Sequence, residues 1–458
     1  MSFSGYSEYA VCSVEWLEQT PSHWASVPMK YLALQPDSVF IDGDWIESKD
    51  LADSGIRYLT TGNVGEGRYR EQGLGFISED KFSELNCTEV FPGDMLVSRL
   101  NRPIGRACVV PELGFRIVTA VDNVVVRADP QFSRSFLVYL FSSSAYFRHT
   151  ENLARGATMQ RISRGLLGNI RLMIPPREEQ TQIAKFLDYE TARIDALIEK
   201  QQQLIALLKE KRQAVISHAV TKGLNPDAPM RDSGVEWLGE VPAHWTVTQI
   251  RYVTSQCGGG TPSKDQAKFW NGDIPWVSPK DMKVDYISDS QDRVTEEAVK
   301  SSSTNLIPVG SVLIVVRGMI LDHSVPTALT TKLVTINQDM KALTPNSELD
   351  AEFLLMFLKG LKDYLLSHTD SSAHGTKCMN SDMLARTLIG LPPRNEQREL
   401  VKGLKVRLGQ LDRLAESAES MQATLQERRI ALISAAVTGK LDVRNWQAPE
   451  AHAQAEVA

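Results

Sequence analysis

The sequence predicts an α+β protein in which two mixed α/β globules are joined by two long helices that form an antiparallel coiled coil, with an internal pseudo-twofold repeat. Three pairs of matching phrases predict this arrangement. VEWLEQTPSHW (14–24) returns as VEWLGEVPAHW (235–245), IPPREEQ (174–180) returns as LPPRNEQ (391–397), and AVISHAVTKGL (214–224) returns as ALISAAVTGKL (431–441). The repeat is far longer than the period of about 20–50 residues found in solenoids, so it indicates one module present twice.

Two segments between the matched phrases, about 25–172 and 246–389, do not resemble each other in sequence. Both alternate short apolar runs with Gly, Pro, Asn and Asp, as in GDMLVSRL (93–100), which is typical of short strands and turns. Both also contain stretches with helical periodicity, such as residues 351–369. Each segment is therefore predicted to be a mixed α+β globule.

A long helix is predicted after each pair of prolines, because the second proline suits the first turn of a helix, where no N–H is needed. Glu178, Glu179 and Glu396 place negative charge at these helix starts. A heptad seam follows in both copies, and about 40 residues would make a rod of about 60 Å. Its main apolar positions are Leu187, Ile194, Ile198, Ile205, Leu208, Leu404, Leu408, Leu411, Leu425 and Leu432. Both copies interrupt the seam at a matched arginine, Arg212 or Arg429. Packing of each helix on its own globule is the alternative to pairing of the two helices.

The patterns divide the chain into five parts: a globule at 1–172, a helix at 173–224, a globule at 225–389, a helix at 390–441 and a disordered tail at 442–458. A hydrophobic content of 42% and a charged content of 23% are ordinary for a soluble globular protein. We find no apolar run of about 18 residues and no signal peptide. Five scattered cysteines argue against a cysteine-based zinc site and fit a reducing compartment. We therefore expect a cytoplasmic protein.

Basic and amide residues gather near the turns of both globules, where they would suit DNA phosphates and base edges. The net charge of −6 is unusual for a DNA-binding protein, so this inference rests on the distribution of charge. A solvated face is the alternative explanation. The candidate DNA-binding residues are Arg99, Arg102, Arg106, Arg155, Gln160, Arg161, Arg164, Gly259, Gly260, Thr261, Lys264, Lys280, Arg317, Lys341 and Lys377.

The glycines belong to CGGGTPSKD (257–265), a loop whose backbone amides could approach a DNA phosphate, although a purely structural turn would use the same residues. The loop lacks the pattern of a nucleotide-binding P-loop.

A catalytic site finds little support in the sequence. Asp37, Glu47 and Lys49 follow the loose pattern of metal-dependent nucleases, which is frequent by chance and has no counterpart in the second half. His23 and His244 recur within P-x-H-W and are expected to pack at the start of each module. A metal-dependent nuclease and a scaffold that never touches DNA remain as alternatives to a DNA-binding protein without its own chemistry.

The matched phrases, together with GGGTPSKDQAKFWNGDIPWVSPKDM (258–282) and INQDMKAL (336–343), resemble the specificity subunits of type I restriction–modification enzymes over about residues 14–441. The resemblance implies a non-catalytic reader of double-stranded DNA with a target-recognition domain in each globule and a spacer built from the two helices. It also implies docking of two adenine-methyltransferase subunits, which would bring S-adenosylmethionine, whereas this chain would bind no cofactor. Nuclease-translocase subunits would join that core. Because the globules differ, we expect a split, asymmetric target whose half-site centres lie about one helical turn apart.

Overall fold

The computed structural model describes residues 4–12, 14–156, 159–371 and 376–449. The chain forms two compact units: unit 1 comprises Met1–Gln201 and Ser420–Ala458, and unit 2 comprises Gln202–Glu419. The long helices are α5 (Arg177–Lys222) and α11 (Arg394–Val437), both within the ranges predicted for them. Each unit combines one globule with half of each long helix, so the division between units falls inside the helices rather than at their ends.

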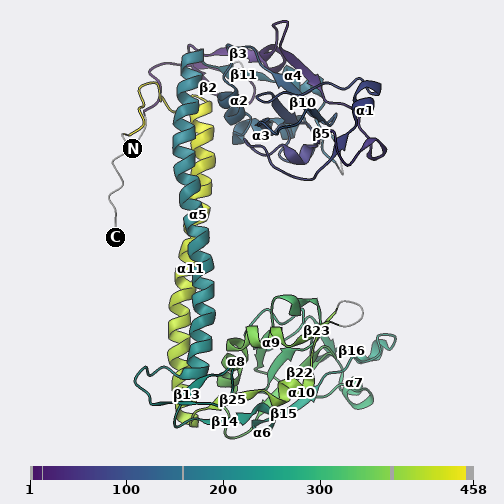
Figure 1. Cartoon of the computed structure of the whole chain (residues 1–458), viewed down its shortest axis with the longest axis vertical. Coiled ribbons are helices and arrows are strands. Elements are labelled where there is room, and N and C mark those ends of the chain that lie inside the picture. The colour runs from purple at the N-terminus through teal and green to yellow at the C-terminus, as the bar shows by residue number, and fades with distance from the viewer. Residues whose placement is uncertain (1–3, 13, 157–158, 372–375, 450–458) are drawn as a thin grey trace. The chain divides into compact units, whose positions relative to one another are not determined.

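The globule of unit 1 contains two sheets of more than two strands (Figure 1). The larger is antiparallel, in the order β4 (Val39–Asp42), β10 (Asn123–Arg127), β7 (Met95–Ser98) and β8 (Ala107–Val109). The smaller has the order β6 (Phe76–Ile77), β5 (Ile56–Leu59) and β9 (Ile117–Thr119), with β5 and β9 parallel. The helices of this globule are α1 (Glu79–Glu84), α2 (Arg134–Leu140), α3 (Ser144–Leu153) and α4 (Arg164–Asn169). Each follows a serine whose hydroxyl accepts a first-turn N–H, which explains where these helices begin.

Unit 2 repeats this topology. Its larger sheet has the order β15 (Thr254–Gly258), β22 (Met340–Pro345), β19 (Val312–Val315) and β20 (Thr327–Thr330), extended by β17 (Tyr286–Ile287). Its smaller sheet has the order β18 (Asp292–Val294), β16 (Trp270–Val277) and β21 (Thr335–Ile336), with β16 and β21 parallel. Its helices are α6 (Ile250–Val253), α7 (Glu296–Ser301), α8 (Ala351–Gly360), α9 (Lys362–Ser367) and α10 (Ser381–Arg386). The two globules therefore share one fold although their sequences are dissimilar.

Short two-stranded pairs complete each unit. A hairpin opens each module, β1 (Tyr9–Val11) with β2 (Gln19–Pro21) and β12 (Met230–Asp232) with β13 (Glu240–Pro242). The strand that leads into each long helix pairs with the strand that follows the hairpin, β11 (Arg171–Ile174) with β3 (Ala25–Pro28) and β25 (Leu388–Leu391) with β14 (Thr246–Gln249). Unit 2 also has β23 (Thr369–Ser371) paired with β24 (Lys377–Met379).

One close backbone contact explains a glycine in each globule. A Cβ added to Gly43 would lie 2.5 Å from the carbonyl oxygen of Thr119, and one added to Gly259 would lie 2.4 Å from that of Ile336. Such a distance is too short for any side chain, so both positions require glycine. The two globules thus share a packing constraint that their overall sequences conceal.

The two long helices are antiparallel. In unit 1, Arg429 Nε lies 2.8 Å from Asp195 Oδ1, and in unit 2, Arg212 Nε lies 2.9 Å from Asp412 Oδ1. Residue numbers therefore fall along α11 as they rise along α5, and within each unit the helix segments lie side by side (Figure 1). All ten predicted seam leucines and isoleucines are buried or half-buried, as we expect of side chains that face a partner helix.

The ends of the helices also enter the cores of the globules. Phe186 and Leu187 of α5 and Ile433 of α11 belong to the same buried cluster as Phe136 of α2 in unit 1. Unit 2 has a corresponding cluster. Packing on the globule and pairing of the helices, which the sequence presented as alternatives, therefore both occur. Within the described part of the chain, none of the helices has the length and apolar character needed to cross a membrane.

The segment after α11 corrects the expectation of a disordered tail at 442–458. Trp446 packs on Phe186 and Tyr189, with ring centroids 5.3 and 5.5 Å apart, and the Gln182 side-chain amide donates to the carbonyl of Val443 at 3.2 Å. The apolar surface of α5 provides the reason, because an indole can be buried on it. Residues 450–458 of the expected tail lie outside the described residues.

Candidate nucleic-acid interface

Unit 1 gathers most of its predicted DNA-binding residues in one place. We call them the arginine group: Arg102, Arg155, Gln160, Arg161 and Arg164. The loop after β7 meets the 160–162 segment, where Asn101 N–H donates to the carbonyl of Gln160 at 3.2 Å. Arg102 Nε donates to Gln160 Oε1 at 2.8 Å, and Arg161 pairs with Asp122 at 2.8 Å. The four arginines are exposed, so their guanidinium groups remain accessible to a phosphate or a base edge.

Arg99 and Arg106 do not belong to that exposed surface, which corrects the expectation of direct DNA contact for both. They are only 4% and 8% exposed. Arg106 donates to the carbonyls of Val64 at 2.7 Å and Thr61 at 2.8 Å, and Arg99 donates to the carbonyl of Val121 at 2.5 Å. Burial lowers the pKa of both guanidinium groups. Arg99 also donates to the carbonyl of Ile162 and Arg106 to that of Asn101, so these two buried residues hold the segments that carry the arginine group.

Unit 2 presents a concavity of about 810 Å³. Its lining includes Thr261, Lys264, Trp270, Asn271, Trp276, Lys280 and Gln338. Lys264 and Lys280 make no hydrogen bond or ion pair with other residues in the described ranges, so both ammonium groups are available. Thr261 donates to Gln338 Oε1, which leaves the Gln338 amino group as a donor. This unit 2 concavity therefore combines two lysines and amide groups of the kind that read base edges with two carboxylates, those of Asp292 and Asp339.

Asn271 and Gln338 were absent from the residues predicted from the sequence. They are far apart in the chain and become neighbours of one concavity because β16 pairs in parallel with β21. The bulge in β16 between Trp270 and Ile274 places Asn271 in a left-handed conformation, φ 62°. Asparagine tolerates that conformation better than most residues, so the asparagine itself was a local sequence signal for this position.

Gly259 and Gly260 also require a correction. Their amides donate to the carbonyls of Met340 at 3.4 Å and Ile336 at 2.9 Å, so neither is free to bind a phosphate. A Cβ on Gly260 would lie 2.6 Å from Ser303 Oγ. Close packing, rather than a phosphate contact, explains this pair of glycines.

The remaining three candidates lie near the ends of strands in unit 2. Arg317 is exposed and pairs with Cys378 in an isolated bridge, beside half-buried Lys377. Lys341 lies opposite Gly258 in the pairing of β22 with β15, and burial lowers the pKa of its ammonium group. The arrangement around Arg317 matches the arginine group, where the bridge joins Leu100 and Arg161.

The alternative metal site is not assembled in unit 1. Glu47 is taken up by an ion pair with Lys49 at 2.5 Å, which lowers the pKa of the Glu47 carboxyl. Among the residues that the structure describes, no group of three or more His, Cys, Asp and Glu is placed to hold a metal ion.

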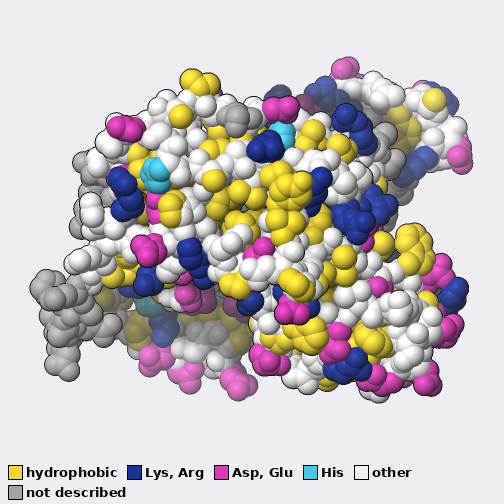
Figure 2. Space-filling model, turned by 90° about the horizontal axis from the view of Figure 1, so that it is seen from above, with side chains coloured by type: hydrophobic (Ala, Val, Ile, Leu, Met, Phe, Trp, Pro, Cys, Tyr) yellow, Lys and Arg dark blue, Asp and Glu magenta, His cyan; other side chains and the backbone are white. Residues whose placement is uncertain are grey.

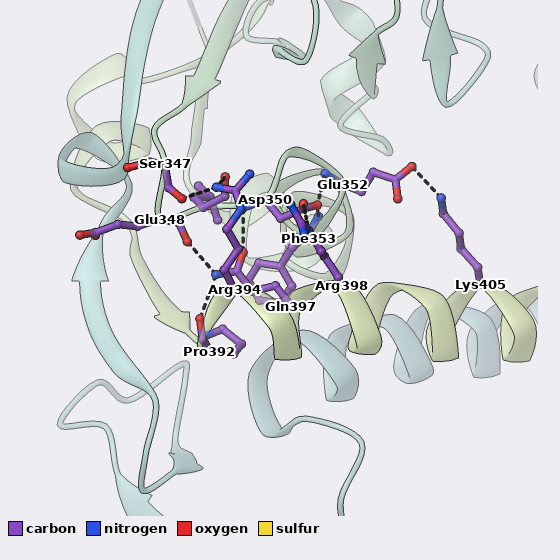
Figure 3. Close-up of polar contacts among 11 residues, drawn as sticks. Ser347, Glu348, Asp350, Glu352, Phe353, Pro392, Arg394, Gln397, Arg398 and Lys405 are labelled. Carbon is purple, nitrogen blue, oxygen red and sulfur yellow. Dashed lines mark hydrogen bonds and ion pairs between the residues drawn. The ribbon is translucent and has the colours of Figure 1, made fainter.

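The repeated phrase at the helix starts fastens each helix to its globule. Gln397 is fully buried, and its side-chain amide joins two backbone segments (Figure 3). Oε1 accepts the N–H of Asp350 at 2.7 Å, and Nε2 donates to the carbonyls of Glu348 and Pro392, each at 2.9 Å. Gln180 makes the equivalent clasp in unit 1. The phrase is therefore repeated because both units use the same joint.

Acidic and basic side chains are interspersed on the face drawn in Figure 2, with Lys and Arg in small groups instead of one uniformly basic surface. This distribution agrees with the net charge of −6. A nucleic acid would therefore be held through local groups of cations, such as the arginine group and the unit 2 concavity.

The two globules share one fold but present different sets of exposed cationic and amide side chains, and both are attached to the same pair of long helices. These features define a recognition protein with two different binding domains. The family model described as "Type I restriction modification DNA specificity domain" matches residues 38–207 and 242–418, and the chain belongs to that family.

Relatives and solved structures agree with this assignment. The specificity subunit of the type I restriction enzyme EcoR124I/EcoR124II from Escherichia coli is 38% identical over 175 residues, which span 38% of this chain and 40% of that protein. A putative type I restriction enzyme MjaX specificity subunit from Methanocaldococcus jannaschii is 23% identical and is matched over 81% of this chain and 84% of its own length. The HsdS subunit from Thermoanaerobacter tengcongensis has a TM-score of 0.54 at 17% identity, covering 92% of this chain and 98% of that one. A chain from a type I R-M system reaches 0.70 at 18% identity, covering 92% and 99%, and at such identities the likeness establishes the fold.

Proposed function

We propose that this chain is the non-catalytic DNA sequence-specificity subunit of a type I restriction–modification complex and reads a bipartite, asymmetric target. The observation that carries the proposal is one framework with two different sets of exposed side chains. Among the candidate residues, unit 1 presents four arginines and Gln160, whereas unit 2 presents Lys264, Lys280, Arg317 and the side-chain amides of the concavity. Identical heads on a twofold scaffold would favour a palindrome, so different heads favour two unlike half-sites.

A modification map of host DNA with and without this chain tests the proposal. Single-molecule sequencing should show one split adenine-methylated motif that disappears when the gene for the chain is deleted. The motif should have two unlike half-sites separated by a gap of fixed length. Unchanged methylation in cells whose methyltransferase is active would contradict the proposal.

The two helices also carry exposed apolar residues that support docking of two identical partners. Leu197, Leu204, Leu414 and Met421 are 42–57% exposed. They lie seven residues apart on each helix and occupy the same heptad position, which flanks the seam. Unit 1 contributes Leu197 and Met421, and unit 2 contributes Leu204 and Leu414, so each unit presents an equivalent pair. We propose that each pair holds one methyltransferase subunit, which brings S-adenosylmethionine, and that nuclease-translocase subunits join this core.

The double variant Leu197→Glu and Leu414→Glu is expected to lose both methyltransferase copies while the chain keeps its fold. Both residues are about half exposed, so charge there costs the fold little, whereas burying it under a partner is strongly unfavourable. Light scattering of the purified complex would report the loss of mass. Lys200→Glu, an exposed change outside the stripe, serves as the control. Retention of both copies in the double variant would place the docking surface elsewhere.

A further inference from the structure

A buried carboxylate joins the start of the first module to the start of α5. Glu179 Oε1 accepts hydrogen bonds from Trp24 Nε1 at 3.0 Å and from the Tyr6 hydroxyl at 2.6 Å, and Oε2 lies 2.7 Å from His23 Nε2. The Glu179 side chain is only 6% exposed. Burial and the neighbouring carboxylate raise the pKa of the Tyr6 phenol, so this group remains a donor. Three side chains from one end of the module therefore converge on one residue in the first turn of the helix.

Unit 2 builds the same joint with one donor fewer. Glu396 Oε1 accepts from Trp245 Nε1 at 3.0 Å, and Oε2 lies 2.8 Å from His244 Nε2. The Glu396 side chain is 35% exposed. The distances to the indole and imidazole thus agree within 0.1 Å between units, although the joint in unit 2 is more open to solvent. The recurring P-x-H-W phrase packs at the module start, as the sequence predicts, and these contacts explain why His and Trp return together.

Each tryptophan connects the carboxylate joint to a helix of its globule. Trp24 packs edge-on against Phe136 of α2, and Trp245 packs against Phe353 of α8, with centroids 6.5 Å apart and an interplanar angle of 83° in both cases. The strand that follows each tryptophan pairs with the strand that leads into the long helix. The strand, the tryptophan and the start of the long helix are therefore connected to one another around the carboxylate.

We propose that Glu179 and Glu396 are positioning residues that fix the orientation of each globule on its helix, and that they thereby determine how strictly the complex requires one gap length between half-sites. This inference rests on the proposed function. Neither glutamate belongs to the arginine group or the unit 2 concavity. Their loss should therefore change tolerance for the gap while the bases preferred within each half-site stay the same.

A small tilt at the helix start is sufficient for this effect. α5 contains 46 residues. At a rise of about 1.5 Å per residue, a tilt of about 5° displaces the far end by about 6 Å, compared with about 3.4 Å per base pair of B-DNA. The apolar contacts of Phe186 and Leu187 secure the helix in the core but are non-directional. The orientation therefore depends on directional contacts, which are the side-chain amide clasp of Gln180 and the hydrogen bonds to the Glu179 carboxylate.

Methyl transfer by complexes purified with their methyltransferase subunits tests the inference. Glu179→Gln and Glu396→Gln would be assayed on duplexes with the native gap and with gaps one base pair shorter and longer. Each variant should raise the ratio of altered-gap to native-gap rates by about 10-fold, because a hydrogen-bonded charge is lost. Glu178→Gln and Glu399→Gln are matched controls, since both residues are exposed on the same helix starts. The controls should retain the discrimination of the unmodified complex.

His23→Asn and His244→Asn are milder second variants that remove one partner and leave the carboxylate in place. An intermediate gain in gap tolerance with unchanged base preference would support the inference. Wild-type discrimination in all four joint variants, or altered base preference within a half-site, would overturn it. Absence of any split methylated target in the unmodified complex would instead overturn the proposed function, and this inference with it.

Discussion

Lys280→Ala is expected to reduce methylation of the intact target by about 10- to 100-fold, which corresponds to about 1–3 kcal/mol for a specific base contact. Lys280 lines the unit 2 concavity and has no partner among the described residues, so no interaction within the protein competes for its ammonium group. A lysine beside side-chain amides suits the acceptor edge of guanine in the major groove. The specificity of one half-site should relax, while the other half-site is read normally.

The measurement is a methylation-rate profile over duplexes in which each target position is changed in turn. A base contact would relax one position in one half-site. A phosphate contact would weaken all sequences alike and reduce the slope of log affinity against log salt by about 1. Lys300→Ala is the control, because this exposed lysine on α7 pairs with Glu296 and does not line the concavity.

Arg161→Ala provides the matching change in unit 1 and should affect the other half-site. Its effect should be smaller, because the Arg161 guanidinium already pairs with Asp122 at 2.8 Å and must exchange that partner for DNA. Unchanged methylation profiles in both Lys280→Ala and Arg161→Ala would favour a scaffold that does not read DNA.

The repeated parts of the fold could be predicted because they carry strong local signals. Paired prolines mark both helix starts, and heptad leucines mark the seam. The arginines that interrupt the seam, Arg212 and Arg429, could not be explained until Asp412 and Asp195 were seen beside them. These aspartates are matched between copies as well, so each interruption is half of a repeated ion pair that fixes which residues face each other.

The shared fold of the globules could not be predicted, because burial constrains strands to be apolar without specifying which apolar residue occurs. The feature that repeats between the two globules is the geometry of their turns. Thr60 N–H donates to Asn63 Oδ1 in unit 1, and Ser278 N–H donates to Asp281 Oδ2 in unit 2, both at 2.8 Å. Different residue pairs thus make one turn, and sequence comparison of the two segments does not detect it.

The candidate interface could be predicted only in part, because composition does not report exposure. Arg99 and Arg102 are three residues apart and equally basic, yet one is buried against carbonyls and the other is exposed. Gln338 belongs to the phrase INQDMKAL that carried the family resemblance, so a signal for it was present. Its place beside Lys280 in the lining of one concavity depends on long-range strand pairing, which the sequence alone does not specify.

Leu187→Ala and Leu404→Ala are each expected to lower the free energy of unfolding by about 2–5 kcal/mol, the range for truncation of a buried leucine. Both side chains have no exposed surface, and each belongs to the core of its unit as well as to the seam. Urea denaturation followed by circular dichroism would measure the loss. Leu197→Ala and Leu414→Ala are the controls and should change stability by less than about 0.5 kcal/mol, because both side chains are about half exposed.

This comparison separates two reasons for which leucines recur at the same helix positions in both copies. All four are apolar and recur between the copies, although the seam predicted from the sequence includes only Leu187 and Leu404. Burial predicts that only Leu187 and Leu404 support the fold, whereas the proposed docking surface assigns the other pair to a partner. When retention of methyltransferase subunits is measured in place of unfolding, the changes at Leu197 and Leu414 should therefore have larger effects than those at Leu187 and Leu404. Equal destabilisation by all four changes would show that the exposed stripe belongs to the fold of this chain and would remove the argument for docking there.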